Sequence, residues 1–473
     1  MGRELDYDIV VIGCGAAGTA AALSAAESAK NQGEDLRIAI LERANFDNRG
    51  GNSRWTASYM RMKNIDEVAD HFVEDMMTFS DNYADRPYIE TLAANAGPTL
   101  RWVEEKGVDF DYLPTMFLTS TRPRLLPVGG GRAIIDNLSR RASALGVEII
   151  YEATAWEIGL DEDGAVSELM VRIKGGASLN LKIGALILAA GGFQGSHEMM
   201  AQYIGRDAHT IRPVCEGGKY NKGEAIRMAL NIGAKGTGQY DAFHAEPVDP
   251  RSKREEAAVM TYPYAILVDK NGNRFVDEGI STIDEQYEAV ARKIFYDLPG
   301  HIAYMISDQK MYDIPNYEQA LETDKPAIVA DTLEELADKI GVPAASLKAT
   351  VEQFNAAVQP GEFNSKKKDG KKAVGITPPK SNWAITIDQA PFIAYPIVCS
   401  NVFTNGGLAT DTNGRVLSGD DHPIPGLYAA GETAGLYYGK YPGGTSVLRA
   451  LVYGKISGAH AVNYVTNPEK IGI

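Results

Sequence analysis

The 473-residue sequence predicts an α/β fold in which one discontinuous domain is interrupted by an inserted α+β domain. A β-branched run at residues 8–12 stops at Gly13 and leads into small residues of high helix propensity. A second apolar run, residues 38–41, ends at Glu42, so this segment is typical of strand, turn, helix and strand. A composition rich in glycine and other small residues returns after Pro391, which indicates that the domain is built from both ends of the chain.

The change in residue composition along the chain divides it into three segments. Residues 1–239 and 385–473 are predicted to form one domain, and residues 240–384, richer in tyrosine and charge, to form the inserted domain. Within the first segment, helical patterns with long polar faces occupy residues 65–80 and 84–106. A buried strand is expected within residues 182–193, after a hairpin-like pattern.

The composition is that of a globular protein, with 44% hydrophobic and 23% charged residues. Lysine and arginine number 47 against 62 aspartate and glutamate, and the net charge of -15 argues against nucleic acid or an anionic membrane as the main partner. No run approaches the roughly 20 apolar residues that span a bilayer. Because Cys14, Cys215 and Cys399 form neither a disulfide framework nor a zinc site, we expect a cytoplasmic, reducing location and no metal.

A turn with the pattern GxGxxG occupies residues 13–18, between the first predicted strand and helix. The first glycine of this pattern turns the chain, the second lets the backbone approach a pyrophosphate, and the third packs helix on strand. By itself the pattern is an ordinary tight turn. Here Glu42 follows at the tip of the next strand, where a carboxylate can bind ribose hydroxyls. This Rossmann-like arrangement predicts a dinucleotide with an unphosphorylated ribose, either FAD or NAD.

Four further segments accompany this turn, at residues 50–53, 189–193, 426–432 and 441–446. Taken singly, each is an ordinary turn. In this order and at these spacings they resemble the flavoprotein family of fumarate reductase and succinate dehydrogenase, which also includes 3-ketosteroid dehydrogenases and tricarballylate dehydrogenase. The resemblance covers nearly the whole chain.

The resemblance implies FAD lying extended across the larger domain, with its adenosine end at residues 13–18 and its isoalloxazine near residues 51–53. It also implies that residues 443–446 bring a helix N-terminus to the pyrimidine edge of the flavin, where the helix dipole stabilises the reduced cofactor. Covalently flavinylated members carry Ser-His-Thr where this chain has residues 54–56, Arg-Trp-Thr, so noncovalent FAD is expected. The implied cofactor-binding residues are Gly13, Gly15, Ala16, Ala17, Gly18, Glu42, Arg43, Gly51, Asn52, Ser53, Ala155, Ala190, Gly191, Gly192, Gly431, Glu432, Gly444, Ser446 and Val447.

The segments that bind substrate in soluble fumarate reductases differ in this chain. The Gly-x-Arg-Phe-x-x-Glu motif is present at residues 272–278, but the Thr-Thr-Arg-Asp segment that supplies the proton-donor arginine is replaced by residues 279–284, which contain no arginine. Asn-Arg-Leu-Gly-Gly is replaced by residues 440–444, Lys-Tyr-Pro-Gly-Gly, and His-Thr-x-Gly-Gly by residues 403–407, which begin with phenylalanine. Efficient fumarate reduction is therefore not expected. The Tyr-Pro-Gly-Gly segment resembles tricarballylate dehydrogenases, and ketosteroid dehydrogenases carry a similar Tyr-Pro-Gly.

We interpret the chain as an FAD-dependent oxidoreductase that acts on a CH–CH bond next to a carboxylate or carbonyl, with a tricarballylate-like substrate and an unidentified electron acceptor. The inserted domain is expected to act as a lid over the substrate. The expected catalytic residues are Tyr441, a hydrogen-bond donor to the substrate, and His244, for which a purely structural role is the alternative. The expected substrate-binding residues are Arg54, Arg124, Lys440 and Thr445.

Two other functions remain open on the sequence alone. A 3-ketosteroid dehydrogenase would have an apolar pocket and act on steroids. A flavoprotein subunit of an electron-transfer complex would depend on a partner protein, since the chain has no haem-binding Cys-x-x-Cys-His of its own.

Overall fold

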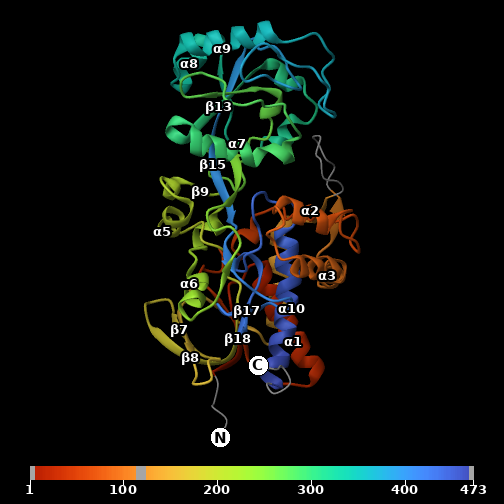
Figure 1. Ribbon diagram of the computed structural model, residues 1–473, viewed down its shortest axis with the longest axis vertical. Helices are drawn as coiled ribbons and strands as arrows, with labels where there is room; N and C mark the ends of the chain where they lie inside the picture. Colours follow the sequence, from red (N-terminus) through yellow and green to blue (C-terminus); the bar gives the residue numbers. More distant parts are fainter. Residues whose placement is uncertain (1–5, 113–123, 468–473) are drawn as a thin grey trace. The chain divides into compact units, whose positions relative to one another are not determined.

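The computed structural model describes residues 6–112 and 124–467, which fold as two compact units (Figure 1). The first unit contains the described residues up to His244 and those from Val402 onward, and the second contains Ala245–Asn401. The residue pattern predicts the two boundaries after residues 239 and 384. In the structure each boundary lies inside a strand, β11 (Phe243–Val248) and β15 (Phe392–Thr404).

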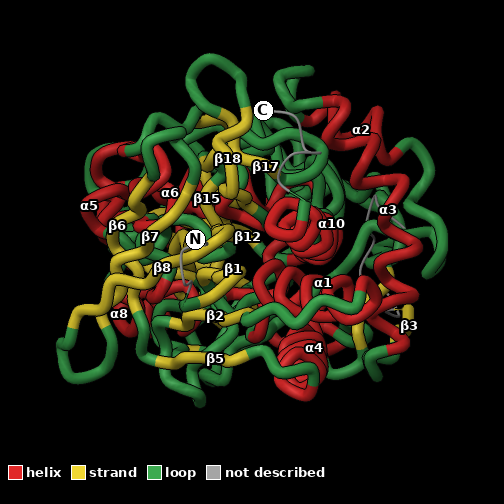
Figure 2. The backbone as a smooth tube through the Cα atoms, turned by 90° about the horizontal axis from the view of Figure 1, so that it is seen from below, coloured by secondary structure: helices red, strands yellow, loops and turns green. Residues whose placement is uncertain are grey.

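The core of the first unit is a sheet with the order β17-β18-β8-β1-β2-β5. Four of its strand pairs are parallel, because the crossover connections return each strand in the same direction. Figure 2 shows β5, β2, β1 and β8 in succession, with α1, α4 and α10 grouped beside them. The antiparallel pair β6 and β7 continues from β8. The strands are β1 (Tyr7–Ile12), β2 (Ile38–Glu42), β5 (Glu148–Tyr151), β6 (Thr154–Leu160), β7 (Val166–Arg172), β8 (Ser178–Leu188), β17 (Arg415–Leu417) and β18 (Pro423–Ala429).

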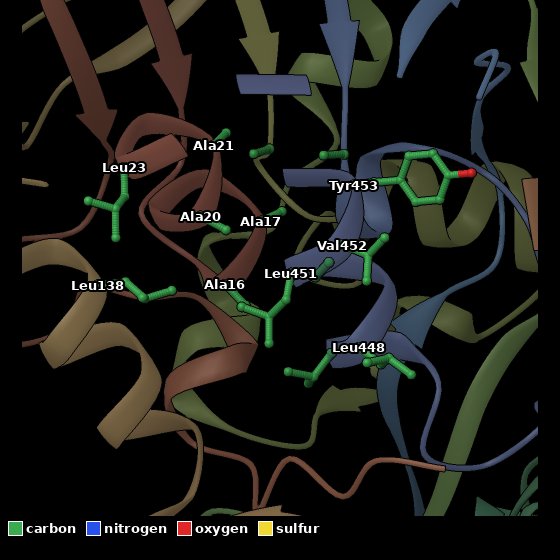
Figure 3. Packing of buried hydrophobic residues seen from close by; sticks show 14 of the residues in the cluster. Ala16, Ala17, Ala20, Ala21, Leu23, Leu138, Leu448, Leu451, Val452 and Tyr453 are labelled. Carbon is green, nitrogen blue, oxygen red and sulfur yellow. The ribbon is translucent and has the colours of Figure 1, made fainter. Parts of the chain in front are cut away.

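Two long helices cover this sheet and touch each other closely. Figure 3 shows alanines of α1 (Ala16–Gln32) packed beside larger residues of α10 (Ser446–Thr466). The approach is close enough to require glycine on α10, since a Cβ at Gly454 would lie 2.3 Å from the Ala17 carbonyl oxygen. At Gly458 a Cβ would lie 2.1 Å from the carbonyl oxygen of Ala21. Small residues on both helices therefore set the distance between them.

The helices that follow β2 agree with the sequence prediction only in part. Helix α3 (Arg86–Glu105) confirms the helix expected at residues 84–106, and the Asp85 carboxylate caps it by accepting from the Tyr88 N–H at 3.3 Å. The helix expected at residues 65–80 is shorter, because α2 spans only Phe72–Phe79. The side-chain oxygen of Asn64 accepts from the backbone N–H groups of Asp66 and Glu67, at 2.8 and 3.0 Å, and this Asx turn replaces the first half of the helix.

The second unit contains an antiparallel sheet in which β15 pairs with β13 (Ile302–Asp308) and β13 pairs with β12 (Ile266–Asp269). Its helices are α7 (Ile283–Asp297), α8 (Leu333–Ile340) and α9 (Ala344–Ala357). The buried carboxylate of Glu278 accepts from Arg274 at 2.6 Å and from the Leu267 N–H at 2.9 Å, and the Lys380 ammonium lies 3.5 Å away. The Gly-x-Arg-Phe-x-x-Glu motif thus forms a paired charge network inside this unit.

The remaining α-helices and strands of the described chain have the following bounds. They are β3 (Phe110–Tyr112), β4 (Leu125–Pro127), α4 (Gly130–Ala144), α5 (His197–Met199), β9 (Arg212–Pro213), α6 (Glu224–Asn231), β10 (Gly236–Thr237), β14 (Ile328–Ala330) and β16 (Gly407–Leu408). Among the described residues, no helix combines the length and the apolar character that crossing a bilayer requires.

Replacing Gly458 by alanine tests the contact between α1 and α10. We expect a free energy of unfolding lower by about 1 to 3 kcal/mol, because the new methyl group overpacks the contact with Ala21. Helix propensity alone has the opposite sign, favouring alanine by about 1 kcal/mol. Urea unfolding followed by circular dichroism measures the difference. Gly419→Ala is the control, since a Cβ there meets nothing within 4 Å, and a more stable Gly458→Ala variant would contradict the packing argument.

Candidate cofactor and substrate site

A cleft of about 830 Å³, counting the part open to solvent, lies at the carboxyl ends of the parallel strands of the first unit. The carboxyl edge of a parallel sheet is where this type of fold binds its ligands, because the strand-to-helix turns converge there. The cleft is lined by residues of the β1–α1 turn, the end of β2, the turn at residues 50–53, and the segments at residues 153–155, 189–191, 220–228 and 430–432. Residues far apart in the sequence therefore meet in one site.

The three glycines of the GxGxxG turn have different reasons to be glycine. A Cβ at Gly13, which has φ +102°, would lie 2.3 Å from the Ala189 carbonyl oxygen, and one at Gly18 would lie 1.9 Å from the Gly13 carbonyl oxygen. Packing within the protein thus requires glycine at both positions. Gly15 has φ -76°, and a Cβ there would meet nothing closer than 3.5 Å. Its side-chain position opens toward the cleft, which fits a cofactor backbone approaching at that point.

The N-terminus of α1 suits a pyrophosphate. Gly15 is the N-cap, no acidic residue lies in the first turn, and no side chain of the described residues caps the helix. The first N–H groups of the helix and its dipole can then bind an anion. The residues present fit the phosphate part of a dinucleotide.

Glu42 lies at the end of β2 with its carboxylate almost completely buried. One of its oxygens accepts from the Cys14 N–H at 2.9 Å, and the other from the Ala44 N–H at 2.8 Å. Burial raises the pKa of this carboxyl group, and the backbone donors oppose the rise. Backbone N–H groups of Cys14, Ala44 and Gly50 hold the carboxylate. The acceptor position left on it suits a ribose hydroxyl, so Glu42 fits the role predicted for it.

Glu432 is the second buried acid of the cleft. Its carboxylate accepts from the Thr404 N–H at 2.9 Å and from the Gln194 side chain at 3.4 Å, and the Asn221 amide lies 3.5 Å away. Burial raises the pKa of Glu432 to about 7, because the hydrogen bonds only partly offset the loss of solvation. Polar groups from three separate segments converge on this one carboxylate.

Most of the predicted cofactor-binding residues line the cleft. These are Gly13, Gly15, Ala16, Ala17, Glu42, Arg43, Gly51, Asn52, Ser53, Ala155, Ala190, Gly191, Gly431 and Glu432. Five do not, namely Gly18, Gly192, Gly444, Ser446 and Val447. Gly192 serves packing instead, since a Cβ there would lie 2.1 Å from the Thr404 hydroxyl.

Sequence reasoning missed one whole wall of the cleft. The start of α6 and the turn before it contribute Tyr220, Asn221, Glu224, Ala225 and Met228. Asn221 is the polar residue among them that reaches Glu432, and a Cβ at Gly191 would lie 2.5 Å from its amide nitrogen. The only sequence signal for this wall of the cleft was the Gly223-Glu224 pair at a helix start, and such a pair is too common to identify a site.

Tyr441 is held by the N-terminus of α10. Its hydroxyl oxygen accepts from the backbone N–H groups of Thr445 and Ser446, each at 3.0 Å, and its hydroxyl hydrogen is donated to the Ser446 hydroxyl at 3.1 Å. A side chain of the turn therefore satisfies two helix N–H groups that would otherwise lack partners. This fixes the phenol, as the rigid Tyr-Pro-Gly-Gly turn predicts.

Aromatic rings surround Tyr441 within the first unit. The His244 ring centroid lies 4.5 Å from that of Tyr441, and the Phe403 ring packs edge-on at 4.9 Å and 84°. Tyr437 packs edge-on at 5.2 Å and 83°. The structure thus brings together both predicted catalytic residues and the phenylalanine that replaces the family's histidine.

The predicted substrate-binding residues do not all gather at this place. The Arg124 guanidinium lies 4.0 Å from the position of a Cβ on Gly443, beside the Tyr441 turn. Lys440 is exposed, and its backbone N–H donates to the Phe79 carbonyl. The Thr445 hydroxyl bonds to the Tyr437 hydroxyl at 2.9 Å, and the Arg54 guanidinium donates to the Asp47 carbonyl at 2.7 Å. Substrate binding by these four residues stays a prediction.

The described side chains form no group of three or more histidine, cysteine or acidic residues that could hold a metal. Cys14, Cys215 and Cys399 are free thiols, and all three are buried.

The pKa of Glu432 predicts a pH dependence of the cofactor-free protein. Since the folded-state pKa of about 7 lies above the ordinary 4.5, the folded state binds more protons between these pH values, and its stability falls as pH rises through them. Glu432→Gln removes this loss, so the variant should gain up to about 3 kcal/mol in free energy of unfolding relative to wild type between pH 4.5 and pH 8. Denaturant titrations over that range measure the gain, with the exposed Glu162→Gln as control. Parallel pH profiles for wild type and Glu432→Gln would contradict the raised pKa.

Comparison with known proteins agrees with the geometry of the cleft. The sequence profile of a family described as FAD binding domain matches residues 8–448. Vinyl phenol reductase of Lactiplantibacillus plantarum is 28% identical over 98% of each chain. Urocanate reductase of Eggerthella lenta is 28% identical over 97% of this chain and 75% of its own.

Among solved structures, the open conformation of a flavocytochrome c3 fumarate reductase is similar, with a TM-score of 0.80 and 25% identity over 98% of this chain and 79% of that one. The family match includes the cleft-lining residues of the first unit up to Glu432. The chain belongs to the FAD-binding domain family, and it is an FAD-dependent oxidoreductase of CH–CH groups.

Proposed function

We propose that this enzyme oxidises or reduces a carbon–carbon bond next to a carboxylate or carbonyl, and that tricarballylate-like polycarboxylates are its first candidate substrates. The observation that carries the proposal is the hydroxyl of Tyr441, fixed at the helix terminus with the Arg124 guanidinium beside the same turn. A fixed hydrogen-bond donor next to a cation suits an oxygen on which negative charge develops.

FAD supplies the hydride acceptor, or the hydride donor in the reverse direction, when it is bound. The residues that would hold it are those of the cleft, with the α1 N-terminus at the phosphates and Glu42 at the ribose. Residue 55 is tryptophan where covalently flavinylated members carry histidine, and this supports noncovalent binding.

Tyr441 is proposed to polarise the substrate oxygen. Two backbone donors already occupy its acceptor side, and its own hydrogen is donated to the Ser446 hydroxyl. A small rotation of the O–H bond moves that hydrogen to a substrate carbonyl or carboxylate without moving the ring. Arg124 would bind a carboxylate, because a guanidinium forms two parallel hydrogen bonds with it.

His244 is proposed to act with Tyr441, because its ring packs directly on the tyrosine ring and is 3% exposed. Within the reaction it would bind or accept a proton at the substrate, a role for which histidine is suited near neutral pH. Its position next to Tyr441 supports this role over a purely structural one.

A second candidate substrate is an alkene conjugated to an aromatic ring. The rings of His244, Phe403 and Tyr437 around Tyr441 favour a flat, apolar substituent where a fumarate-type site would place cationic side chains. The relative that matches over 98% of both chains is a vinyl phenol reductase, which supports the same choice. A ketosteroid substrate and a role as a partner-dependent electron-transfer subunit are the remaining alternatives.

A substrate panel tests the proposed function. Anaerobically reduced enzyme is mixed with trans-aconitate, a vinyl phenol, fumarate, urocanate and a steroid enone, and oxidised enzyme with tricarballylate, while flavin absorbance is followed. We expect at least one of the other compounds in the panel to react at least about tenfold faster than fumarate. Fumarate should react slowly because the arginine that donates its proton in fumarate reductases is absent here. Fumarate as the best substrate, or no flavin reaction with any of them, would contradict the proposal.

Tyr441→Phe tests the role of the fixed hydroxyl. With the best substrate of the panel, the rate of flavin reaction should fall by about 10²-fold while FAD content stays normal, since one donor to the developing charge is lost. Stopped-flow absorbance measures the rate. Tyr437→Phe is the matched control, because it removes a hydroxyl from the same helix terminus and leaves Tyr441 in place. An unchanged rate in fully loaded Tyr441→Phe enzyme would mean that the hydroxyl only caps α10.

A further inference from the structure

An ion pair joins two walls of the FAD cleft. The Arg43 guanidinium lies 2.7 Å from the Glu224 carboxylate, and both residues line the cleft. Arg43 directly follows β2, next to the ribose-site residue Glu42, and Glu224 is the first residue of α6. The two walls are distant in the sequence, so the pair is a tertiary connection across the site.

Both ends of this connection are anchored. On one wall, the carboxylate of Glu42 is held by two backbone N–H groups, which fixes the chain just before Arg43. On the other, Gly223 has φ +76° and its N–H donates to the Gly192 carbonyl at 3.0 Å, which fixes the start of α6. The side chains themselves remain accessible, with 23% of Arg43 and 34% of Glu224 exposed. Hydrogen bonds thus hold the backbone on both walls, whereas the ion pair between them is reached by solvent.

We propose that Arg43 and Glu224 form an ionic clasp that retains FAD by closing the cleft at its adenosine end. A partly exposed pair is weak and opens readily, so it slows the exit of the cofactor without blocking its entry. Salt screens such pairs, so the clasp also makes retention of FAD depend on ionic strength.

Direct binding of Arg43 to FAD would give the opposite result for the removal of Glu224. If Arg43 bound an FAD phosphate directly, Glu224 would compete with the cofactor for the guanidinium, and removing Glu224 would strengthen FAD binding. In a clasp, removing either residue weakens retention by the same amount. The two single variants therefore decide between the arrangements.

The experiment measures the rate of FAD release from the holoenzyme at 50 and 500 mM NaCl, followed as the rise in flavin fluorescence after dilution into a large volume of flavin-free buffer. The variants are Arg43→Gln, Glu224→Gln and the double variant. We expect each single variant to release FAD about 2- to 5-fold faster at low salt, the double variant to match the singles, and only wild type to accelerate at high salt.

Lys219→Gln is the matched control, because it breaks the nearby Lys219–Glu216 pair (2.6 Å), whose residues do not line the cleft. It should leave the release rate unchanged. Because Arg43→Gln does not alter α6, equal effects of the two single variants exclude a local loss of that helix as the cause. Wild-type release rates in both single variants, or slower release in Glu224→Gln, would overturn the clasp.

Discussion

The close approach of backbone segments at the carboxyl edge of the sheet is the constraint on which the FAD site depends. Gly13 turns beside Ala189 and Gly18 packs on Gly13, in both cases without space for a Cβ. These contacts place the N-terminus of α1 at the end of β1, and an uncapped helix terminus of this kind suits a phosphate group. On α10, Gly454 and Gly458 bring the second helix against α1 in the same way.

Buried carboxylates give the cleft its electrostatic character. Glu42 and Glu432 both lie out of solvent, and for both burial is the largest influence on the pKa. Backbone N–H groups stabilise the charged form of each, so their orientation depends on the chain and not on a single counterion. A cleft built this way can bind hydroxyl groups of a cofactor through acceptors that are already fixed in place.

The N-terminus of α10 connects the cofactor domain to the proposed chemistry. Residues 443–446 are expected to direct the helix terminus at the flavin, but Gly444, Ser446 and Val447 do not line the cleft. The Tyr441 hydroxyl accepts from two of the helix N–H groups instead. The helix N-terminus thus holds the phenol in place, and the phenol hydrogen is donated to the Ser446 hydroxyl.

The sequence by itself determined the features that depend on local sterics and period. The residue pattern was enough to predict the first strand, turn and helix, the acid at the end of β2 and the glycine turns. It was enough because backbone conformation restricts which residues fit there. The replaced arginine and histidine segments could also be identified from the sequence, because the family's motifs stand at fixed spacings. The tertiary structure alone decided that Asn221 and Glu224 belong to the cleft, that Arg54 turns to the backbone of Asp47, and that residues 65–71 are not helical. The place of Asn221 and Glu224 in the cleft depends on which distant segments folding brings together, and a side chain of ordinary local preference carries no sequence signal of such a partner. The other two outcomes depend on hydrogen bonds to nearby residues, from Arg54 to Asp47 and within the Asx turn before α2, which compete with the expected substrate role and the expected helix.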